Sequence, residues 1–508
     1  ANAGNEIADF LIGIEITDAS NSGDTTTIRD NKFTNFQGAE IALKNLDQAQ
    51  VNATKNYWGA DKCASNGTYG NGATISGSIN YMPCWSNTNL NSLYSFFIEE
   101  EAEDANPTYH HTFDELIAAI NSDTDEVILN EAHADSETIA DNDENDSTKF
   151  TCQGNAVTGN SFAAAITVES DTNTFTNCKF GNNLTLNGTN PTLSGGSVAG
   201  NTIFGDSNNV ANNISGVTFT GTVTVNGDGH NFNTSNFNNT LTGNGNSLTF
   251  NTDGEDGNRN IFAETINLSG DTVKFDNNTF NANADVTLSG DTVTFQDNAT
   301  VTESATFSGT NPIVTTNVFT AAVTLSNTNA NNNNNIRSNT FNNTVLTSGS
   351  GHQFKGGANT FKKTLTIDNQ NILVDSNTFD INVNDAYAIV TSDNKNIDGL
   401  NISNNNFSEA AGTDKVSGIQ LGDSSDASTV IINNNTFADK QENILHAKDN
   451  NNVTFTNNNI NSTLDPGTGD GEAHKAIILD GSDNTYNIGG ANAGNEIADF
   501  LIGIEITD

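Results

Sequence analysis

A short phrase, Asn-x-Phe, returns at nearly constant intervals, and no other feature limits the fold so strongly. It stands as Asn317-Val318-Phe319, Asn339-Thr340-Phe341, Asn359-Thr360-Phe361 and Asn377-Thr378-Phe379, with intervals of 22, 20 and 18 residues between the phenylalanines. A second phrase, LSGDTV, occurs at 268–273 and again at 288–293. A period of about 20 residues is typical of a solenoid, in which a repeat buries its apolar face only against its neighbours.

Short runs with a period of two lie between these phrases, such as Val223-Thr224-Val225 and Leu365-Thr366-Ile367. Apolar residues that alternate with polar ones and are interrupted by Asn, Gly or Ser predict β-strands. We therefore expect an all-β chain folded as a parallel β-helix (β-solenoid) of roughly fifteen to twenty coils. Phe, Ile, Val and Leu would lie inside, and inward Asn side chains would bond to the next coil. A β-sandwich fits less well, because sandwiches do not repeat one phrase for so long.

One stretch of 18 residues, ANAGNEIADFLIGIEITD, occurs without change at 1–18 and at 491–508. The two copies define a period of 490 residues. We interpret the chain as a window on a tandem array. The alternative is a duplicated chain end without an array.

The stretch YHHTFDELIAAI at 109–120 breaks the β pattern. Thr112 and Glu115 form a capping box, and an apolar helical face follows. That face consists of Phe113, Leu116, Ile117 and Ile120. We predict an amphipathic helix that caps the N-terminal end of the β-helix and covers its unpaired edge.

These signals divide the chain into four parts. Residues 109–490 would carry the capping helix and the main β-helix of a unit. Residues 1–90 carry the sequence that follows residue 490 in the 490-residue period. They would therefore be the C-terminal coils and terminal lobe of such a unit. Residues 91–108 hold the run Glu99–Asp104 and then Asn106-Pro107, which is typical of an acidic linker. Residues 491–508 would begin the next period.

With these elements the chain resembles right-handed parallel β-helix proteins of the pectin-lyase-like superfamily, specifically large microbial surface proteins. The opening FDELIAAINSDTDEVIL at 113–129 and the closing segment from NATKNYWG at 52–59 to INYMPCW at 79–85 carry this resemblance. It implies a right-handed coil. It implies little about function, because the superfamily includes lyases, hydrolases, epimerases, adhesins and structural members.

The charge of the chain excludes several kinds of partner. It has 18 basic and 62 acidic residues and a net charge of −44. Nucleic acids and anionic membrane surfaces attract clustered Lys and Arg, so neither is an expected partner. The sequence contains no apolar run of about 18 residues, the length that a membrane-spanning helix needs, so we expect no membrane insertion within it. Calcium would relieve repulsion between the carboxylates.

Four cysteines suggest an oxidising, extracellular setting. We predict a Cys63–Cys84 disulfide that closes a Gly-rich loop, and a second candidate, Cys152–Cys178, if the coil register brings the two residues together. Asn66 is the best candidate for a glycan, because it lies in an Asn-x-Thr triplet of that exposed loop.

Four carboxylates, Asp18, Asp393, Asp423 and Asp480, each follow an apolar strand run. If the coils are in register, these carboxylates stack along one edge about 4.8 Å apart and form a possible calcium site. A solvated acidic face that keeps the protein soluble is the alternative. No other cofactor is required by any motif.

The enzymes of the superfamily need particular catalytic side chains, and this sequence offers few candidates for them. Arg259 follows Asp253, Glu255 and Asp256, but in one Gly-rich loop rather than on stacked coils. Asn251-Thr252-Asp253 and Gly229-His230 match only fragments of the hydrolase pattern. We expect all histidines at the surface or at bends, namely His110, His111, His133, His230, His352, His446 and His474.

We therefore expect a non-catalytic extracellular or cell-surface structural protein, whose tandem units self-associate into a filament, sheath or stalk. An adhesin or polysaccharide-binding β-helix is the alternative, and a lyase, hydrolase or epimerase is a third hypothesis. Exposed aromatic side chains in a row would favour sugar binding. Tyr57, Trp58, Tyr69, Tyr81 and Trp85 do cluster in the sequence, but beside two cysteines, which favours a packed terminal lobe.

Overall fold

The computed structural model of the 508-residue chain forms two compact units, Ala1–Asn201 and Thr202–Asp508, each of which is described by itself. It describes residues 5–17, 26–36, 40–46, 51–53, 56–59, 64, 74–76, 79–80, 84, 97–100, 108–110, 126–129, 133, 136–139, 149–152, 161–169, 171–205, 213–251, 259–326, 335–383, 386–409, 416–439, 443–449, 451–462, 475–481, 485–490, 494–498 and 502–507. Every regular element in these ranges is a strand. The predicted capping helix, with Thr112, Phe113, Glu115, Leu116, Ile117 and Ile120, lies outside the described residues. No helix in the described ranges is long and apolar enough to cross a membrane.

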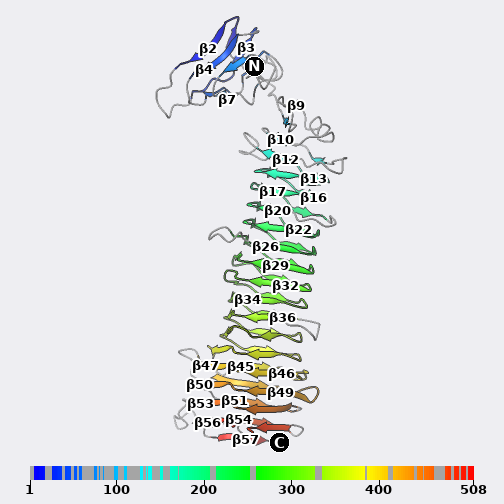
Figure 1. The fold of residues 1–508 in the computed structure, drawn as a ribbon, viewed down its shortest axis with the longest axis vertical. Helices are drawn as coiled ribbons and strands as arrows, with labels where there is room; N and C mark the ends of the chain where they lie inside the picture. Colours follow the sequence, from blue (N-terminus) through cyan, green and yellow to red (C-terminus); the bar gives the residue numbers. More distant parts are fainter. Residues whose placement is uncertain are drawn as a thin grey trace. The chain divides into compact units, whose positions relative to one another are not determined.

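The second unit is a parallel β-solenoid with three sheet faces, as its sequence predicts (Figure 1). The first face contains β20 (Asn213–Ser215), β23 (Asn231–Asn233), β26 (Leu248–Asn251), β29 (Thr272–Asp276), β32 (Thr292–Gln296), β34 (Ile313–Thr315), β37 (Asn335–Arg337), β40 (Gln353–Phe354), β43 (Leu373–Asp375), β46 (Leu400–Ser403), β49 (Ser428–Asn433), β52 (Asn451–Thr456) and β55 (Thr485–Ile488). The second contains β19 (Thr202–Phe204), β22 (Val223–Val225), β25 (Leu241–Gly243), β28 (Ile266–Leu268), β31 (Val286–Leu288), β33 (Ala305–Phe307), β36 (Val323–Leu325), β39 (Val345–Thr347), β42 (Leu365–Ile367), β45 (Ala386–Thr391), β48 (Val416–Leu421), β51 (Asn443–Ala447), β54 (Lys475–Asp480) and β57 (Ile502–Thr507). The third contains β21 (Thr218–Phe219), β24 (Asn236–Phe237), β27 (Ile261–Phe262) and β30 (Thr279–Phe280), and then β35 (Val318–Phe319), β38 (Thr340–Phe341), β41 (Thr360–Phe361), β44 (Thr378–Ile381), β47 (Asn406–Glu409), β50 (Thr436–Asp439), β53 (Asn459–Ser462) and β56 (Glu496–Ala498).

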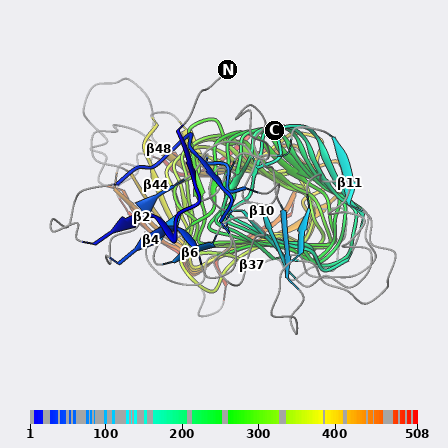
Figure 2. The ribbon, with the colours of Figure 1, turned by 90° about the horizontal axis from the view of Figure 1, so that it is seen from above.

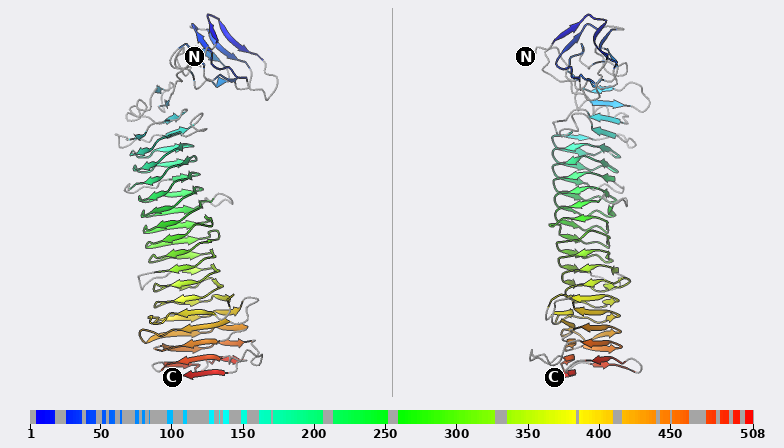
Figure 3. Two further views of the ribbon diagram at one scale, coloured as in Figure 1. Left: turned by 180° about the vertical axis from the view of Figure 1, so that it is seen from behind. Right: turned by 90° about the vertical axis from the view of Figure 1, so that its left-hand side faces the viewer.

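The coils are stacked in register, and their length changes along the second unit (Figure 3). Asn339 donates to Asn359 of the next coil across a sequence separation of 20. Asn405 makes the same contact with Asn435 across a separation of 30. The predicted period is therefore right for the earlier coils and too short for the later ones.

The recurring motif Asn-Asn-x-Phe is explained by one corner of the coil. Asn277 has a φ of 56°, in the left-handed region that Asn tolerates better than most residues. This bend turns the next side chain, Asn278, into the interior, where it is fully buried. Phe280 then points into the core from β30. The same sequence of bend, ladder Asn and core Phe recurs at Asn404, Asn405 and Phe407 and at Asn434, Asn435 and Phe437.

Phenylalanines stack on one another along the core of the second unit. Seen from above, the strands of successive coils of this unit lie over one another (Figure 2). The ring centroids of Phe341 and Phe361 are 5.0 Å apart, those of Phe361 and Phe379 are 4.7 Å apart, and those of Phe379 and Phe407 are 4.7 Å apart. Because parallel register places identical residues over one another, a repeated Phe becomes a continuous column.

The first unit also contains coils of this kind. Its parallel strands are β10 (Glu126–Leu129), β12 (Lys149–Cys152), β14 (Thr174–Thr176) and β17 (Thr192–Ser194), then β11 (Glu137–Ile139), β13 (Ile166–Val168) and β16 (Leu184–Leu186), then β15 (Lys179–Phe180) and β18 (Ser197–Val198). A disulfide joins Cys152 to Cys178, with the Cα atoms 5.1 Å apart, so this predicted pairing is confirmed. Phe150 pairs with Phe175, and Asn177 in the left-handed region turns the following Cys178 toward Cys152.

Part of the predicted linker is structured. Residues Phe97–Glu100 form β8, which pairs antiparallel with β10 and with β9 (Thr108–His110). The edge of the first parallel coil is thus covered by a hairpin backbone, which supplies partners for its N–H and C=O groups. Composition alone did not show this, since an acidic run is typical of a linker.

The described residues from 5 to 84, which we call the lobe, form a separate small core. Its strands are β1 (Glu6–Ala8) with β3 (Lys32–Thr34), β2 (Ile12–Ile16) with β4 (Ile41–Asn45) and β6 (Thr74–Ser76), and β5 (Val51–Asn52) with β7 (Ile79–Asn80), all parallel. Trp58 is fully buried and stacks on Phe33 with a centroid distance of 4.5 Å. Cys84 is buried and in a disulfide, while Cys63 and Asn66 lie outside the described residues, so their pairing and glycosylation stay predictions.

Candidate functional site

A ladder of asparagines, all buried except the half-buried last member Asn495, runs through the interior of the second unit. Its members are Asn260, Asn278, Asn298, Asn317, Asn339, Asn359, Asn377, Asn405, Asn435, Asn458 and Asn495. Each Nδ2 donates to Oδ1 of the next member at distances from 2.8 to 3.2 Å. The ladder was predicted from the inward Asn pattern, and it is confirmed.

Each ladder amide also bonds to the backbone. Nδ2 of Asn339 donates to the Val314 carbonyl at 2.7 Å, and Oδ1 of Asn339 accepts from the backbone N–H of Asn317 at 3.0 Å. All hydrogen-bonding capacity of the side chain is used in a dry interior, where an unmade bond is costly. This arrangement holds neighbouring coils in register.

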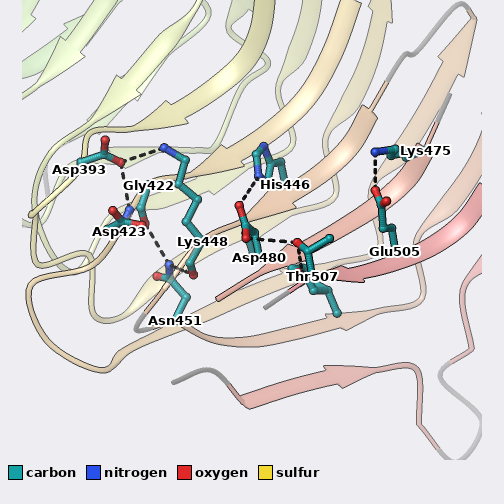
Figure 4. Close-up of polar contacts among 12 residues, drawn as sticks. Asp393, Gly422, Asp423, His446, Lys448, Asn451, Lys475, Asp480, Glu505 and Thr507 are labelled. Atoms are coloured by element: carbon teal, nitrogen blue, oxygen red, sulfur yellow. Dashed lines mark hydrogen bonds and ion pairs between the residues drawn. The ribbon is translucent and has the colours of Figure 1, made fainter. Parts of the chain in front are cut away.

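The predicted acidic edge lies on later coils of the second unit, and we call it the polar edge: Asp393, Asp423, His446, Lys448 and Asp480 (Figure 4). Oδ1 of Asp393 accepts the backbone N–H of Asp423 at 3.1 Å, so these two residues are neighbours, as predicted. Nζ of Lys448 lies 3.2 Å from the same oxygen. The hydrogen bond from Asp423 and the Lys448 ammonium lower the pKa of Asp393.

Asp480 does not continue the row of Asp393 and Asp423. Leu421 pairs with Ala447, and Ala447 pairs with Leu479, so Gly481 rather than Asp480 occupies that row. Asp480 instead accepts from Oγ1 of Thr507 at 3.1 Å and lies 3.8 Å from Nε2 of His446 (Figure 4). Asp18 lies outside the described residues.

Beside the polar edge, the backbone at Gly422 lies very close to the neighbouring coil. A Cβ on Gly422 would lie 2.7 Å from both Oδ1 of Asp393 and the Thr391 carbonyl. Its N–H donates to Oγ1 of Thr391 at 2.8 Å, and its carbonyl accepts from Nδ2 of Asn451 at 3.0 Å. In the described residues, no three His, Cys, Asp or Glu side chains come close enough to hold a metal ion. Calcium binding at this edge remains a prediction.

The histidines differ from expectation in their burial. His230 and His352 follow bends, as predicted, but both are fully buried rather than at the surface. Desolvation lowers the pKa of each to about 4, against opposing effects of Asp228 on His230 and of the Leu325 carbonyl on His352. The His230 ring lies 5.2 Å from that of Phe204. The reason is that a bend of this coil can face inward, so a residue at a bend is not necessarily exposed.

The remaining histidines occupy varied places. His133 is buried, and burial also lowers the pKa of His446, with Asp480 opposing. His110 lies on β9, while His111 and His474 are outside the described residues. Of the loop with Asp253, Glu255, Asp256 and Arg259, only Arg259 is described, so the structure does not test it as a catalytic group.

Comparisons of the chain with protein-family models, with curated proteins and with solved structures found no match.

Proposed function

We propose that the protein is a non-catalytic extracellular structural protein, in which tandem units form a filament, sheath or cell-surface stalk. The observation that supports this most is the ladder from Asn260 to Asn495, which joins successive coils through side-chain hydrogen bonds. A polar network with every amide engaged resists bending and shear, which suits a load-bearing rod.

Further features agree with this proposal. The polar edge is engaged by its own chain, since Lys448 pairs with Asp393 at 3.2 Å and His446 lies 3.8 Å from Asp480. The disulfide between Cys152 and Cys178 fits an oxidising compartment. Of the exposed large apolar side chains in the described residues, Phe10 is the aromatic one, and Trp58 is buried. Binding of polysaccharide along a row of aromatics is therefore the weaker alternative.

Lateral assembly is expected to depend on ions. The net charge of −44 makes neighbouring rods repel, and divalent cations would bridge their carboxylates. We propose calcium as such a bridging ion rather than as a cofactor within one rod.

The test is assembly of a chain that carries two consecutive 490-residue periods. Negative-stain electron microscopy and sedimentation velocity, with calcium and then with excess chelator, should show rods in series that associate more strongly with calcium. The matched control carries Asp393→Asn, Asp423→Asn and Asp480→Asn. Dispersed monomers at every calcium and salt concentration would refute the proposal, and release of unsaturated or reducing sugars from acidic polysaccharides would replace it with an enzymatic function.

A further inference from the structure

The 18-residue stretch that occurs twice forms the same two strands in both places. In the lobe it forms β1 and β2, and in the second unit it forms β56 and β57. In the lobe it is paired with a following coil, since Ile14 lies opposite Leu43 on β4. In the second unit it is paired with a preceding coil, since Ile504 lies opposite Ile477 on β54.

The two copies use opposite sides of one peptide group. In the second copy, the N–H of Glu496 donates to the Asn458 carbonyl of the preceding coil at 3.0 Å. In the first copy, the carbonyl of Asn5 accepts from the Lys32 N–H of the following coil at 2.7 Å. Asn5–Glu6 and Asn495–Glu496 are the same peptide unit in the repeat, and the N–H and C=O of a trans peptide point in opposite directions. One strand can therefore make both sets of bonds at once.

The ladder asparagine, Asn495 in the second copy and Asn5 in the first, also bonds through its side chain toward the preceding coil in one copy and the following coil in the other. Oδ1 of Asn495 accepts from Nδ2 of Asn458 at 3.2 Å, toward the preceding coil. Nδ2 of Asn5 donates to Oδ1 of Asn31 at 3.2 Å, toward the following coil. The lobe continues this ladder from Asn31 to Asn56 at 3.2 Å. One N–H of Nδ2 in Asn495 donates to the Phe455 carbonyl at 2.8 Å, and the ladder bond of Asn5 uses one N–H of the same group toward the following coil. Since Nδ2 carries two hydrogens, one side chain can make both bonds.

Charge and apolar surface complete the match. Glu505 pairs with Lys475 of the preceding coil, and its equivalent Glu15 pairs at 3.0 Å with Lys44 of the following coil. Ile504 and Ile506 are 45% and 74% exposed at the end of the second unit. Their equivalents Ile14 and Ile16 are half-buried and pack against the lobe core.

We propose that the outer edge of β56 and β57 is an interaction surface whose occupants are strands β3 and β4 of the next copy of the repeat. In the array, the duplicated stretch is one shared coil, and the lobe completes the same solenoid. Lys475, the shared glutamate and Lys44 would then form a row of alternating charge. This deepens the proposed function and rests on it for the tandem arrangement.

The experiment extends the chain by a second copy of residues 19–90 after Asp508, which is the order that the period prescribes. Glu505→Cys is combined with Lys44→Cys in the added copy. Glu15 and Lys44 are direct Cα partners, so the two cysteines would lie within disulfide range. Mild oxidation followed by peptide mass spectrometry should find the bond within one chain.

The matched control replaces Glu505→Cys with Ile506→Cys. This moves the thiol to the opposite face of the strand, and the bond should not form. Ile506→Pro is a second variant, because it removes the N–H at a position equivalent to Ile16, whose carbonyl faces the following coil. In that variant the added coil should exchange its amide hydrogens rapidly, while Ile506→Thr should leave it protected.

Outcomes separate this inference from the proposed function. An intramolecular bond in a chain that never assembles would support the shared coil and refute the filament. A folded extended chain with free thiols at both engineered positions would overturn the shared coil, whether or not the chain assembles.

Discussion

The side-chain amide of Asn377 donates to Oδ1 of Asn405 at 3.2 Å, although the two residues are 28 positions apart. In the preceding coil the same bond joins Asn359 to Asn377 over 18 positions. The ladder contact is therefore constant while the coil length changes. Added residues lie outside the corner formed by the bend, the ladder Asn and the core Phe, so this corner sets the register of the solenoid.

The first prediction concerns the ladder. Asn339→Ala should lower the free energy of unfolding by on the order of 3 kcal/mol, because it leaves the Val314 carbonyl and the Asn317 amide buried without this partner. Urea unfolding and native-state hydrogen exchange around β38 would measure the loss. Asn382→Ala, at an exposed position, is the control and should change stability little. Equal effects of the two variants would contradict the structural role of the ladder.

The second prediction concerns the Phe column. Phe361 is fully buried between Phe341 and Phe379, so Phe361→Ala should destabilise the protein by about 3–5 kcal/mol. Phe361→Leu retains most of the volume and should cost clearly less. Thermal unfolding of both variants compares them. Similar losses for Ala and Leu would indicate that the cavity is not the cause.

The third prediction concerns pH. Folding lowers the pKa of His352 from 6.5 to about 4, so between these values the unfolded chain binds the proton and the folded chain does not. This part of the stability is present above pH 6.5 and is lost as the pH falls toward 4. For His352 the full effect is roughly 3 kcal/mol. His352→Gln should shrink the difference in unfolding free energy between pH 7 and pH 4.5 by about 2 kcal/mol.

The unmodified chain and the His352→Gln variant must be compared, because protonation of carboxylates also reduces the repulsion in this acidic chain. That change alone alters the free energy of unfolding. That contribution is common to both proteins and cancels. An unchanged pH dependence in His352→Gln would show that the imidazole is not held neutral by burial.

The fourth prediction concerns the disulfide between Cys152 and Cys178, which have a sequence separation of 26. Replacing both cysteines by Ala should destabilise the coils of the first unit by about 3 kcal/mol, because the unfolded chain gains freedom when the loop opens. Hydrogen exchange at β12 and β14 would report it. If the amide hydrogens of β12 and β14 are equally protected in the variant without the two cysteines, strand pairing alone stabilises this region.

The fifth prediction concerns the polar edge. Lys448→Met removes the ammonium from Asp393 while keeping the length of the side chain, and this should raise the pKa of Asp393 toward its ordinary value. If carboxylates of this edge bind calcium, the variant should bind it more tightly than the unmodified chain, because a competing cation is gone. Isothermal titration calorimetry would measure this. Lys362→Met, at the ion pair with Asp380 on another face, is the control.

Much of the fold followed from local patterns. The alternation in Leu365-Thr366-Ile367 is reproduced in β42, where Leu365 and Ile367 are buried and Thr366 is partly exposed. The inward Asn and the Phe column also followed from the repeat, because a parallel stack places equal positions over one another and needs no further information.

Other features depended on register and on which side of a bend faces inward, and these only the tertiary structure decided. Cys152 meets Cys178 because Phe150 pairs with Phe175, and Asp480 leaves the row of Asp423 because Leu479 pairs with Ala447. A shift of one residue moves a strand side chain to the other face, so no local pattern predicts such neighbours. The burial of His230 and His352 has the same origin: the coil fixes the direction of each bend through contacts with the coils before and after it.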